Sequence, residues 1–476
     1  MELRDLRMPI KVTPYQHQEE AWKFVIGKFE NPGGTALLIE MGCGKSLISV
    51  AVAGTLYEAG KIRKLLIVCP LSICGVWEEE FLKFADFNYD LKILKGTADS
   101  KAMMLNSMNG DSLQVAVVNY ESVWRIEPQI KDWEPDMIVC DESHKIKTHN
   151  IAASKSLHRL GEKAGYKLIL TGTVITNKEI DVFSQYKFLD PQIFGKSFYT
   201  FRNRYFDMVG YGNHTPVLKK SMEPELKEKI HSIAFRATKA ECLDLPETTD
   251  IVRYIDLEPN AMNIYKHLVR DSFAELSRGE VTATNILTKI LRLSQLTGGF
   301  LGDDEGKAIH QISSAKLDAL EDIVDEVTSS GKKLVVIARF IPEINEITKL
   351  LEKKNLKFSI ITGNVKNRSQ QIEKFQNDSD VLVFVGQIAT AGLGITLTAS
   401  STMVFYSLDY SMSNFEQTKA RIHRAGQSDP CTYIYLIAKG TIDEKVMKSL
   451  NKKYDLASSL IDDYRQGLNP FRAERI

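Results

Sequence analysis

The stretch "LLIEMGCGKSLISVAVAG", residues 37–54, decides the fold of the N-terminal part of the chain. An apolar run leads into a Gly-Lys-Ser turn, and helix-forming residues follow the turn. This order indicates a strand, a tight turn and a helix, and backbone N–H groups together with a lysine let such a turn bind phosphate. The strict phosphate-loop pattern has a further glycine where this sequence has Ile39. The stretch by itself therefore leaves an ordinary turn of an α/β core as an alternative.

The composition is that of an ordinary globular protein with room for two or three domains. The chain has 476 residues, of which 43% are apolar and 26% charged, and its net charge is zero. Because no overall positive field attracts nucleic acid, any such contact has to come from local lysines and arginines. The six cysteines form no Cys-x-x-Cys pair, so the sequence predicts neither a zinc site nor a disulfide framework. No secretory signal and no apolar run of roughly 20 residues is visible, so we expect a cytoplasmic protein.

Short apolar runs alternate with helix-like stretches in two parts of the chain. Polar or glycine residues follow each run, as in buried central strands of a parallel sheet. The predicted strands cover residues 35–41, 64–71, 114–120, 136–142 and 167–173, and then 332–340, 357–363, 380–387, 402–408 and 432–440. The fold class is therefore α/β, with two doubly wound lobes in tandem. In such sheets the chemistry lies at the carboxyl ends of the strands.

The remaining segments interrupt this alternation. We predict a first lobe with a helical insertion, a second lobe with another, and a C-terminal tail, at residues 1–243 (insertion 178–231), 244–456 (insertion 258–313) and 457–476. The join "LDLPETTD", residues 243–250, is polar and contains proline, which is typical of a linker. No hairpin that could act as a strand-separating wedge is evident.

A nucleotide hydrolase needs more than a phosphate loop, and the sequence offers further parts. Lys45 can neutralise phosphate charge, and the Ser46 hydroxyl can ligate Mg²⁺. The strand at residues 136–142 ends in Asp141 and Glu142, of which the first can hold Mg²⁺ and the second can activate water. Alone, such a pair is usually a solvated strand end, but its position downstream of Gly-Lys-Ser favours the catalytic interpretation.

The second lobe contains a pair of arginines that could reach a phosphate. Arg421 and Arg424 are three residues apart, which puts both on one helix face, or on one turn and its cap. A lone pair at this spacing is usually a solvated surface. Gly392 and Gly394, in "TAGLGITLTAS", permit close backbone approach to a ligand or to nucleic acid.

Seven ordered segments together resemble the Swi2/Snf2 branch of superfamily 2 helicases, a group of DNA-dependent ATPases with two RecA-like lobes. In chain order they are "TPYQHQEEAW", "EMGCGKS", "LIVCPLSICGVWEEEF", "DESH", "LTGTVITN", "ATAGLGITLTAS" and "QTKARIHRAGQ". They resemble the Q motif and motifs I, Ia, II, III, V and VI of that family. The Arg-x-His-Arg-x-Gly-Gln run is the most specific of them.

The resemblance implies roles for individual residues. It assigns the adenine contact to Gln16, nucleotide binding to Gly42, Cys43, Gly44, Lys45, Ser46, Asp141 and Gly394, and catalysis to Lys45, Glu142, Arg421 and Arg424. It assigns DNA contact or coupling to Pro70, Leu71, Ser72, His144, Thr171, Gly172, Thr173, Gly392 and Gln417. The sequence departs from the family pattern at Ile39, Val174, Thr176 and Ala389, mostly in coupling elements, which puts the strength of coupling in doubt.

The resemblance implies an ATPase that uses ATP and Mg²⁺ and moves along double-stranded DNA. A helicase that separates or anneals strands is one alternative. Another is an ATP-controlled DNA-binding switch that recruits a nuclease or another DNA-processing protein. The short core indicates a minimal bacterial or phage-type member of the family, associated with the nucleoid.

Overall fold

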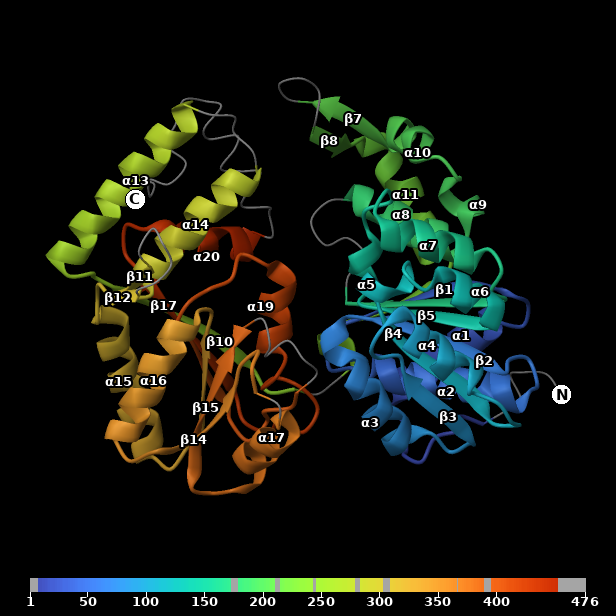
Figure 1. Ribbon diagram of the computed structural model, residues 1–476, viewed down its shortest axis with the longest axis horizontal. Helices are drawn as coiled ribbons and strands as arrows, with labels where there is room; N and C mark the ends of the chain where they lie inside the picture. Colours follow the sequence, from blue (N-terminus) through green and yellow to red (C-terminus); the bar gives the residue numbers. More distant parts are fainter. Residues whose placement is uncertain are drawn as a thin grey trace. The chain divides into compact units, whose positions relative to one another are not determined.

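The chain folds into two compact units, Met1–Asp244 and Leu245–Ile476. The computed structural model describes residues 7–172, 179–209, 215–242, 245–278, 283–302, 309–365, 367–388 and 395–452. The sequence predicted a boundary between residues 243 and 244, and the division lies one residue further along. Figure 1 shows the elements of both units.

Unit 1 is built on a seven-stranded parallel sheet in the order β3-β4-β2-β5-β6-β1-β9. Its strands are β1 (Gly33–Ile39), β2 (Lys64–Cys69), β3 (Tyr89–Ile93), β4 (Leu113–Asn119), β5 (Met137–Asp141), β6 (Tyr166–Thr171) and β9 (Ala234–Ala237). Five of them coincide with predicted strands. The other two, β3 and β9, are the edge strands, and an edge strand needs no continuous apolar run because it is not enclosed on both sides.

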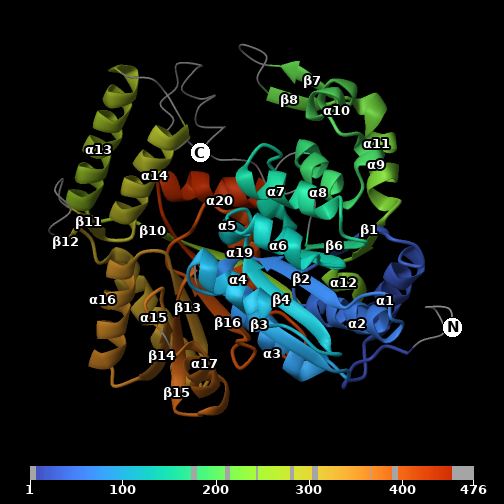
Figure 2. The same cartoon turned by 45° about the vertical axis from the view of Figure 1, so that its right-hand side comes forward.

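Helices cover both faces of this sheet (Figures 1 and 2). On β1, Leu37 and Ile39 belong to one apolar core, and Ala36 and Leu38 belong to the other, because successive side chains of a strand point to opposite faces. The first core is completed by α1 (Gln16–Lys28), α2 (Lys45–Glu58) and α3 (Cys74–Phe84). The second is completed by α4 (Ala98–Asn106), α5 (Tyr120–Val123), α6 (Glu127–Trp133), α7 (Ala152–Gly161) and α8 (Val182–Leu189).

The insertion of unit 1 is mostly helical, but it also contains a hairpin. After α8 come α9 (Pro191–Phe194), α10 (Phe198–Tyr205), the antiparallel pair β7 (Phe206–Val209) and β8 (Thr215–Leu218), and α11 (Glu223–His231); α12 (Lys239–Cys242) follows β9. Short 3-10 turns occur at Leu71–Ile73, Ser143–Ile146, Glu179–Asp181 and Lys220–Met222. The sequence analysis found no hairpin that could act as a wedge, and the β7–β8 pair shows that the insertion does contain a hairpin.

Unit 2 has a six-stranded sheet, also parallel, in the order β10-β17-β16-β13-β15-β14. Its strands are β10 (Thr248–Ile255), β13 (Leu334–Ala338), β14 (Lys357–Ile361), β15 (Val381–Gln387), β16 (Thr402–Phe405) and β17 (Cys431–Ala438). The predicted linker is wrong from Thr248 onward, because β10 begins there and pairs with β17 along its whole length. This edge strand is largely exposed, so its polar sequence gave no strand signal.

Helices also cover both faces of the second sheet. One core contains α13 (Pro259–Arg278), α14 (Ala283–Thr297), α17 (Arg368–Asn377), α19 (Met412–Lys419) and α20 (Ile442–Lys452), and the other contains α15 (Ala315–Ser329) and α16 (Ile341–Lys353). A second hairpin, β11 (Phe300–Gly302) with β12 (Ile309–Gln311), ends the second insertion. The predicted fold class of two α/β units is thus confirmed.

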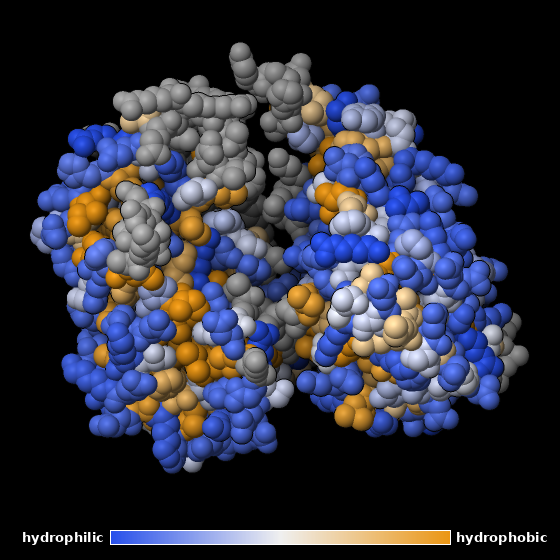
Figure 3. All heavy atoms as spheres, in the orientation of Figure 1, coloured by the Kyte–Doolittle hydropathy of each residue, from blue (hydrophilic) through white to orange (hydrophobic). Residues whose placement is uncertain are grey.

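The surface agrees with this burial pattern. Hydrophilic side chains cover most of the visible surface of each unit, with scattered apolar areas between them (Figure 3). Within the described residues, none of the helices combines the length and the apolar character that crossing a bilayer requires.

Candidate nucleotide-binding site

The Gly-Lys-Ser turn lies at the carboxyl edge of the first sheet, between β1 and α2. Gly42 and Gly44 have φ angles of 87° and 88°, in the left-handed region that L-residues rarely adopt. A Cβ atom on Gly44 would also lie 2.2 Å from Nε2 of Gln18. The turn therefore needs glycine at position 44 for two separate reasons.

Lys45 is the first residue of α2 and folds back over the turn. Its Nζ donates a hydrogen bond to the Ile39 carbonyl oxygen over 2.8 Å. The first N–H groups of α2 receive no side-chain cap from Gly44, and a helix N-terminus of this kind favours an anion. Backbone N–H groups and an ammonium group thus gather at one place, as phosphate binding requires.

Two side chains of the N-terminal helix α1 contact the backbone of the glycine turn. His17 Nε2 lies 2.8 Å from the Cys43 carbonyl oxygen, and Gln18 Nε2 donates to the same oxygen over 3.4 Å. Both side chains are buried. The predicted adenine-contacting residue, Gln16, is exposed instead, and its Nε2 donates to Glu20 Oε1 over 2.9 Å. The sequence analysis missed His17 and Gln18, although three consecutive polar residues at a helix start were the available signal.

Asp141 ends β5 at the same edge of the sheet. Its side chain is almost fully buried; Oδ1 accepts the Glu142 N–H over 2.9 Å, and Oδ2 accepts the Trp77 Nε1–H over 3.2 Å. Burial, and then the neighbouring charge of Glu142, raise the pKa of Asp141 to about 7, while the nearby Lys45 ammonium opposes this rise. A cation beside Asp141 would therefore stabilise its ionised form.

Glu142 has a backbone conformation that is unusual for its residue type. Its φ and ψ angles are both 52°, in the left-handed region, which costs energy for a residue with a Cβ. Oε2 of Glu142 lies 3.2 Å from Nδ1 of His144. His144, the predicted coupling residue, therefore contacts Glu142, which is predicted to activate water. Two buried hydrogen bonds fix this turn: Tyr120 Oη donates to the Asp141 carbonyl oxygen over 2.8 Å, and Ser143 Oγ donates to Gln185 Oε1 over 2.7 Å.

The other predicted residues of unit 1 also lie at this edge. Pro70 and Leu71 follow β2, and Leu71 is 71% exposed. Thr171 ends β6 and is buried, and a Cβ on Gly172 would approach the Ile39 carbonyl oxygen to 3.9 Å. Thr173 and the side chain of Ser72 lie outside the described residues.

The two arginines of unit 2 do not lie within a helix. Because α19 ends at Lys419, Arg421 and Arg424 occupy the turn that follows, which is the second of the two predicted arrangements. Arg421 is buried, and its carbonyl oxygen accepts the Leu397 N–H over 2.9 Å. Arg424 is partly exposed, and its Nη1 donates to the Ile395 carbonyl oxygen over 3.4 Å. Gln417 is partly exposed on α19, while Gly392 and Gly394 lie outside the described residues.

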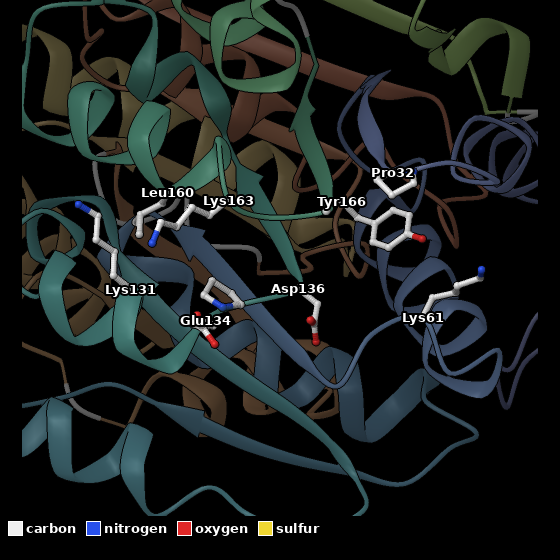
Figure 4. A pocket seen from close by; sticks show the side chains of 10 residues that line it. Pro32, Lys61, Lys131, Glu134, Asp136, Leu160, Lys163 and Tyr166 are labelled. Atoms are coloured by element: carbon white, nitrogen blue, oxygen red, sulfur yellow. The ribbon is translucent and has the colours of Figure 1, made fainter.

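A cavity of about 360 Å³ in unit 1 is not part of this site. Figure 4 shows it at the opposite edge of the sheet, where β1, β5 and β6 begin. Its lining residues include Lys61, Lys131, Lys163, Glu134 and Asp136. No residue predicted to bind nucleotide lines this cavity.

A glycine turn with a lysine, facing an aspartate–glutamate pair across the carboxyl edge of a parallel sheet, defines the class of phosphate-loop nucleotide hydrolases. Comparison with known families agrees with this class. The family model of the SNF2-related domain matches residues 17–298, and that of the helicase conserved C-terminal domain matches residues 315–426. The chain therefore belongs to the SNF2-related family.

Individual relatives are distant but match nearly the whole chain. The chromodomain-helicase-DNA-binding protein 1-like of Danio rerio is 24% identical over 96% of this chain and 45% of the relative. The DNA repair and recombination protein RAD54-like of Drosophila persimilis is 26% identical over 94% of this chain and 63% of the relative. The chain thus spans about half to two thirds of the length of these curated relatives. Among solved structures, the Sulfolobus solfataricus SWI2/SNF2 ATPase core in complex with dsDNA matches with 24% identity, 99% coverage of both chains and a TM-score of 0.47.

Proposed function

We propose that this protein hydrolyses ATP in response to double-stranded DNA and uses the energy to move along the duplex without separating its strands. The observation that carries the proposal is the arrangement of Lys45, Asp141 and Glu142 at one edge of the unit 1 sheet. The match of family models to both units supports it.

In this proposal the phosphates of ATP lie against the turn at Gly42–Lys45 and the N-terminus of α2. Lys45 would leave the Ile39 carbonyl oxygen and neutralise phosphate charge instead. Glu142 would orient and deprotonate the attacking water. Its strained backbone turn and its contact with His144 would fix the orientation of its carboxylate.

A magnesium ion fits the oxygen donors at this site. Ser46 offers a hydroxyl oxygen and Asp141 a carboxylate oxygen, and both are ligands that Mg²⁺ prefers. The raised pKa of Asp141 supports the fit, because an adjacent cation offsets the cost of burying a carboxylate charge. The ion would supply charge neutralisation at the phosphates.

Unit 2 would supply Arg421 and Arg424 to the developing phosphate charge, as arginine fingers do. DNA would be held through its phosphates, a contact that is independent of base sequence and sensitive to salt. Gln16, Gly172 and Gln417 remain predicted contact or coupling residues.

The test is ATP turnover by the whole chain with and without duplex DNA, at several salt concentrations. We expect turnover to rise with duplex DNA and the rise to shrink as salt increases. Movement is then tested by displacement of a third strand from a triplex. Equal turnover with and without DNA at every salt concentration would refute the first part, and turnover without triplex displacement would favour the switch that recruits a partner.

One observation favours a strand-separating helicase as the second candidate. The argument against it was that no wedge hairpin is evident in the sequence, but each insertion contains an antiparallel hairpin. Val209 and Val217 of the β7–β8 hairpin are 42% and 47% exposed, and Ile309 of β12 is 61% exposed. Apolar side chains of this kind can stack against an opened base pair. Release of a labelled strand from a plain duplex would establish this candidate in place of the first.

A further inference from the structure

Two cysteines of unit 1 lie in contact beside the candidate site. Cys69 is the last residue of β2, and Cys74 is the first residue of α3. Their Sγ atoms are 3.5 Å apart. A disulfide bond needs about 2.05 Å between the two atoms, so a shift of roughly 1.5 Å would join them.

The surroundings hold this pair in place. Cys69 is fully buried and paired with Asn119 of β4 through the sheet, so it has little freedom. Cys74 is 5% exposed, and its Sγ also lies 3.6 Å from the Pro70 carbonyl oxygen. Between the two cysteines lies the turn that contains the exposed Leu71.

The two thiols differ in character. The hydrogen bond from the Cys69 thiol lowers the pKa of Cys74, against the opposing effect of burial. The same contact and burial raise the pKa of Cys69. Cys74 is therefore the better nucleophile of the two, because the thiolate is the reactive form.

The first turn of α3 connects this pair to the candidate site. Trp77 follows Cys74 by three residues and donates its indole N–H to Asp141 Oδ2 over 3.2 Å. A movement of Cys74 toward β2 would displace the start of α3 and with it the Trp77 indole. The same movement would change the turn that contains residues 70–72, which the family resemblance assigns to DNA contact.

We propose that Cys69 and Cys74 form a redox-sensitive dithiol, which a two-electron oxidant such as hydrogen peroxide converts into a disulfide, and that this bond slows DNA-stimulated ATP turnover. The second half of the proposal rests on the proposed function. In the first step the Cys74 sulfur attacks a peroxide oxygen, the O–O bond breaks, and the departing hydroxide takes a proton to become water. The Cys69 thiol then loses its proton, its sulfur attacks the Cys74 sulfenic acid, and hydroxide leaves as a second water. Two thiols are oxidised and one peroxide is reduced.

The experiment treats the whole reduced chain with graded hydrogen peroxide, alkylates the remaining thiols, and maps the products by mass spectrometry. We expect two of the six thiols to escape alkylation and one cross-linked peptide to join Cys69 to Cys74. Turnover with duplex DNA should fall by about tenfold or more, because a misplacement of ~1 Å can cost up to ~100-fold in rate. Dithiothreitol should restore both the thiols and the turnover.

Three variants serve as controls, each compared with itself before and after peroxide. Cys69→Ser and Cys74→Ser should lose both the cross-link and the peroxide sensitivity. Cys431→Ser, in unit 2, should retain both. If a serine variant fails to fold, the peptide map of the unaltered chain still shows whether Cys69 and Cys74 form a disulfide.

The outcomes separate this proposal from the proposed function. Alkylation of all six thiols after peroxide, or a disulfide between another pair, would overturn the dithiol. A complete Cys69–Cys74 cross-link with unchanged turnover would overturn its effect on the ATPase. A reduced chain without ATP turnover would refute the proposed function, whereas the cross-link would still support the dithiol.

Discussion

The two units have the same architecture but present their functional residues at opposite edges of their sheets. In unit 1 the glycine turn follows β1, and Asp141 and Thr171 end β5 and β6, all at the carboxyl edge. In unit 2 the turn that contains Arg421 and Arg424 comes just before β17. The Leu397 N–H bonds to Arg421, and His423 Nε2 lies 3.0 Å from the Pro246 carbonyl oxygen. Leu397 and Pro246 precede the strands β16 and β10, so the arginines lie at the amino edge.

This difference follows from the direction of α19. A helix that returns between two parallel strands ends near the amino edge, and residues that follow it lie there. The rule that chemistry lies at the carboxyl ends of strands therefore holds for unit 1 and fails for the arginines of unit 2. A shared fold does not imply a shared site, because in the proposed function each unit contributes different residues to the chemistry.

The units also differ in how they bury charge. Asp141 of unit 1 is buried at the candidate site, next to Lys45 and Glu142. In unit 2, the Nζ atom of Lys316 lies 2.6 Å from Oδ2 of Asp443, and neither residue is one of the predicted site residues. Glu343 is buried on α16. We infer that the buried carboxyl group of Asp141 serves chemistry, whereas the Lys316–Asp443 pair and Glu343 of unit 2 serve stability. Four predictions test this comparison.

The largest effect is expected from Lys45→Ala in unit 1. The change removes an ammonium group from the phosphate turn without removing core packing, so turnover should fall by more than about 10³-fold and ATP binding should weaken strongly. Turnover and binding of a fluorescent ATP analogue are the measurements. Lys61→Ala is the matched control, because Lys61 is an exposed lysine just beyond the other end of α2. Normal turnover by Lys45→Ala would show that the glycine turn of unit 1 takes no part in ATP hydrolysis.

Arg424→Ala in unit 2 should slow turnover by about 10³-fold while ATP binding is largely kept. The reason is that, in the proposed function, this guanidinium acts on the transition state, whereas the glycine turn of unit 1 holds the phosphates of the ground state. Arg253→Ala, which removes an exposed arginine of β10 paired with Asp322, should leave turnover unchanged. If Arg424→Ala weakened binding as much as Lys45→Ala, the division of labour between the units would be wrong.

Lys316→Ala should destabilise unit 2 alone. The change leaves the Asp443 carboxylate buried without its cation, which typically costs about 3–5 kcal/mol. All four tryptophans lie in unit 1, so their fluorescence follows the unfolding of that unit, while circular dichroism follows both units. The denaturation midpoint should shift by circular dichroism and stay in place by fluorescence.

A control variant and one contradicting outcome complete the test of Lys316→Ala. Lys354→Ala removes a partly exposed lysine whose partners Glu321 and Asp325 are exposed, so no carboxylate is left buried, and its unfolding should stay close to that of the unaltered chain. Equal shifts of the fluorescence and dichroism midpoints by Lys316→Ala would mean that the two units unfold together.

The smallest effect concerns Glu343 and pH. Burial raises the pKa of Glu343 to about 7, although Ser407 and two backbone N–H groups of residues 339 and 340 donate to its Oε2. Between the ordinary carboxyl pKa of 4.5 and about 7, the folded state keeps a proton that the unfolded state has lost, so stability falls as pH rises through this window. The slope is about 1.4 kcal/mol per pH unit at most.

The Glu343→Gln variant should lack this contribution, so its stability relative to the unaltered chain should rise from pH 5 to pH 7 by up to about 3 kcal/mol. The measurement is denaturation followed by circular dichroism at several pH values. Glu346→Gln, on the same helix, should leave the pH dependence unchanged. A stability difference that is flat with pH would show that Glu343 titrates normally.

The sequence by itself determined the central strands and the phosphate turn. Buried strands of a parallel sheet need continuous apolar runs, and a turn with left-handed residues needs glycines such as Gly42 and Gly44, so both leave a local record. It also predicted Lys45 and the pair of Asp141 and Glu142 as site residues, because their residue types and order are chemically restrictive.

Only the tertiary structure decided the rest. The edge strands β3, β9 and β10 have mixed sequences, since a strand at the edge of a sheet is less enclosed than a central strand. The support of the turn by His17 and Gln18, the Trp77–Asp141 hydrogen bond and the Cys69–Cys74 contact each depend on how packed elements meet. Contacts of this kind come from packing geometry, so even a local signal such as the three polar residues at the start of α1 does not name the partner.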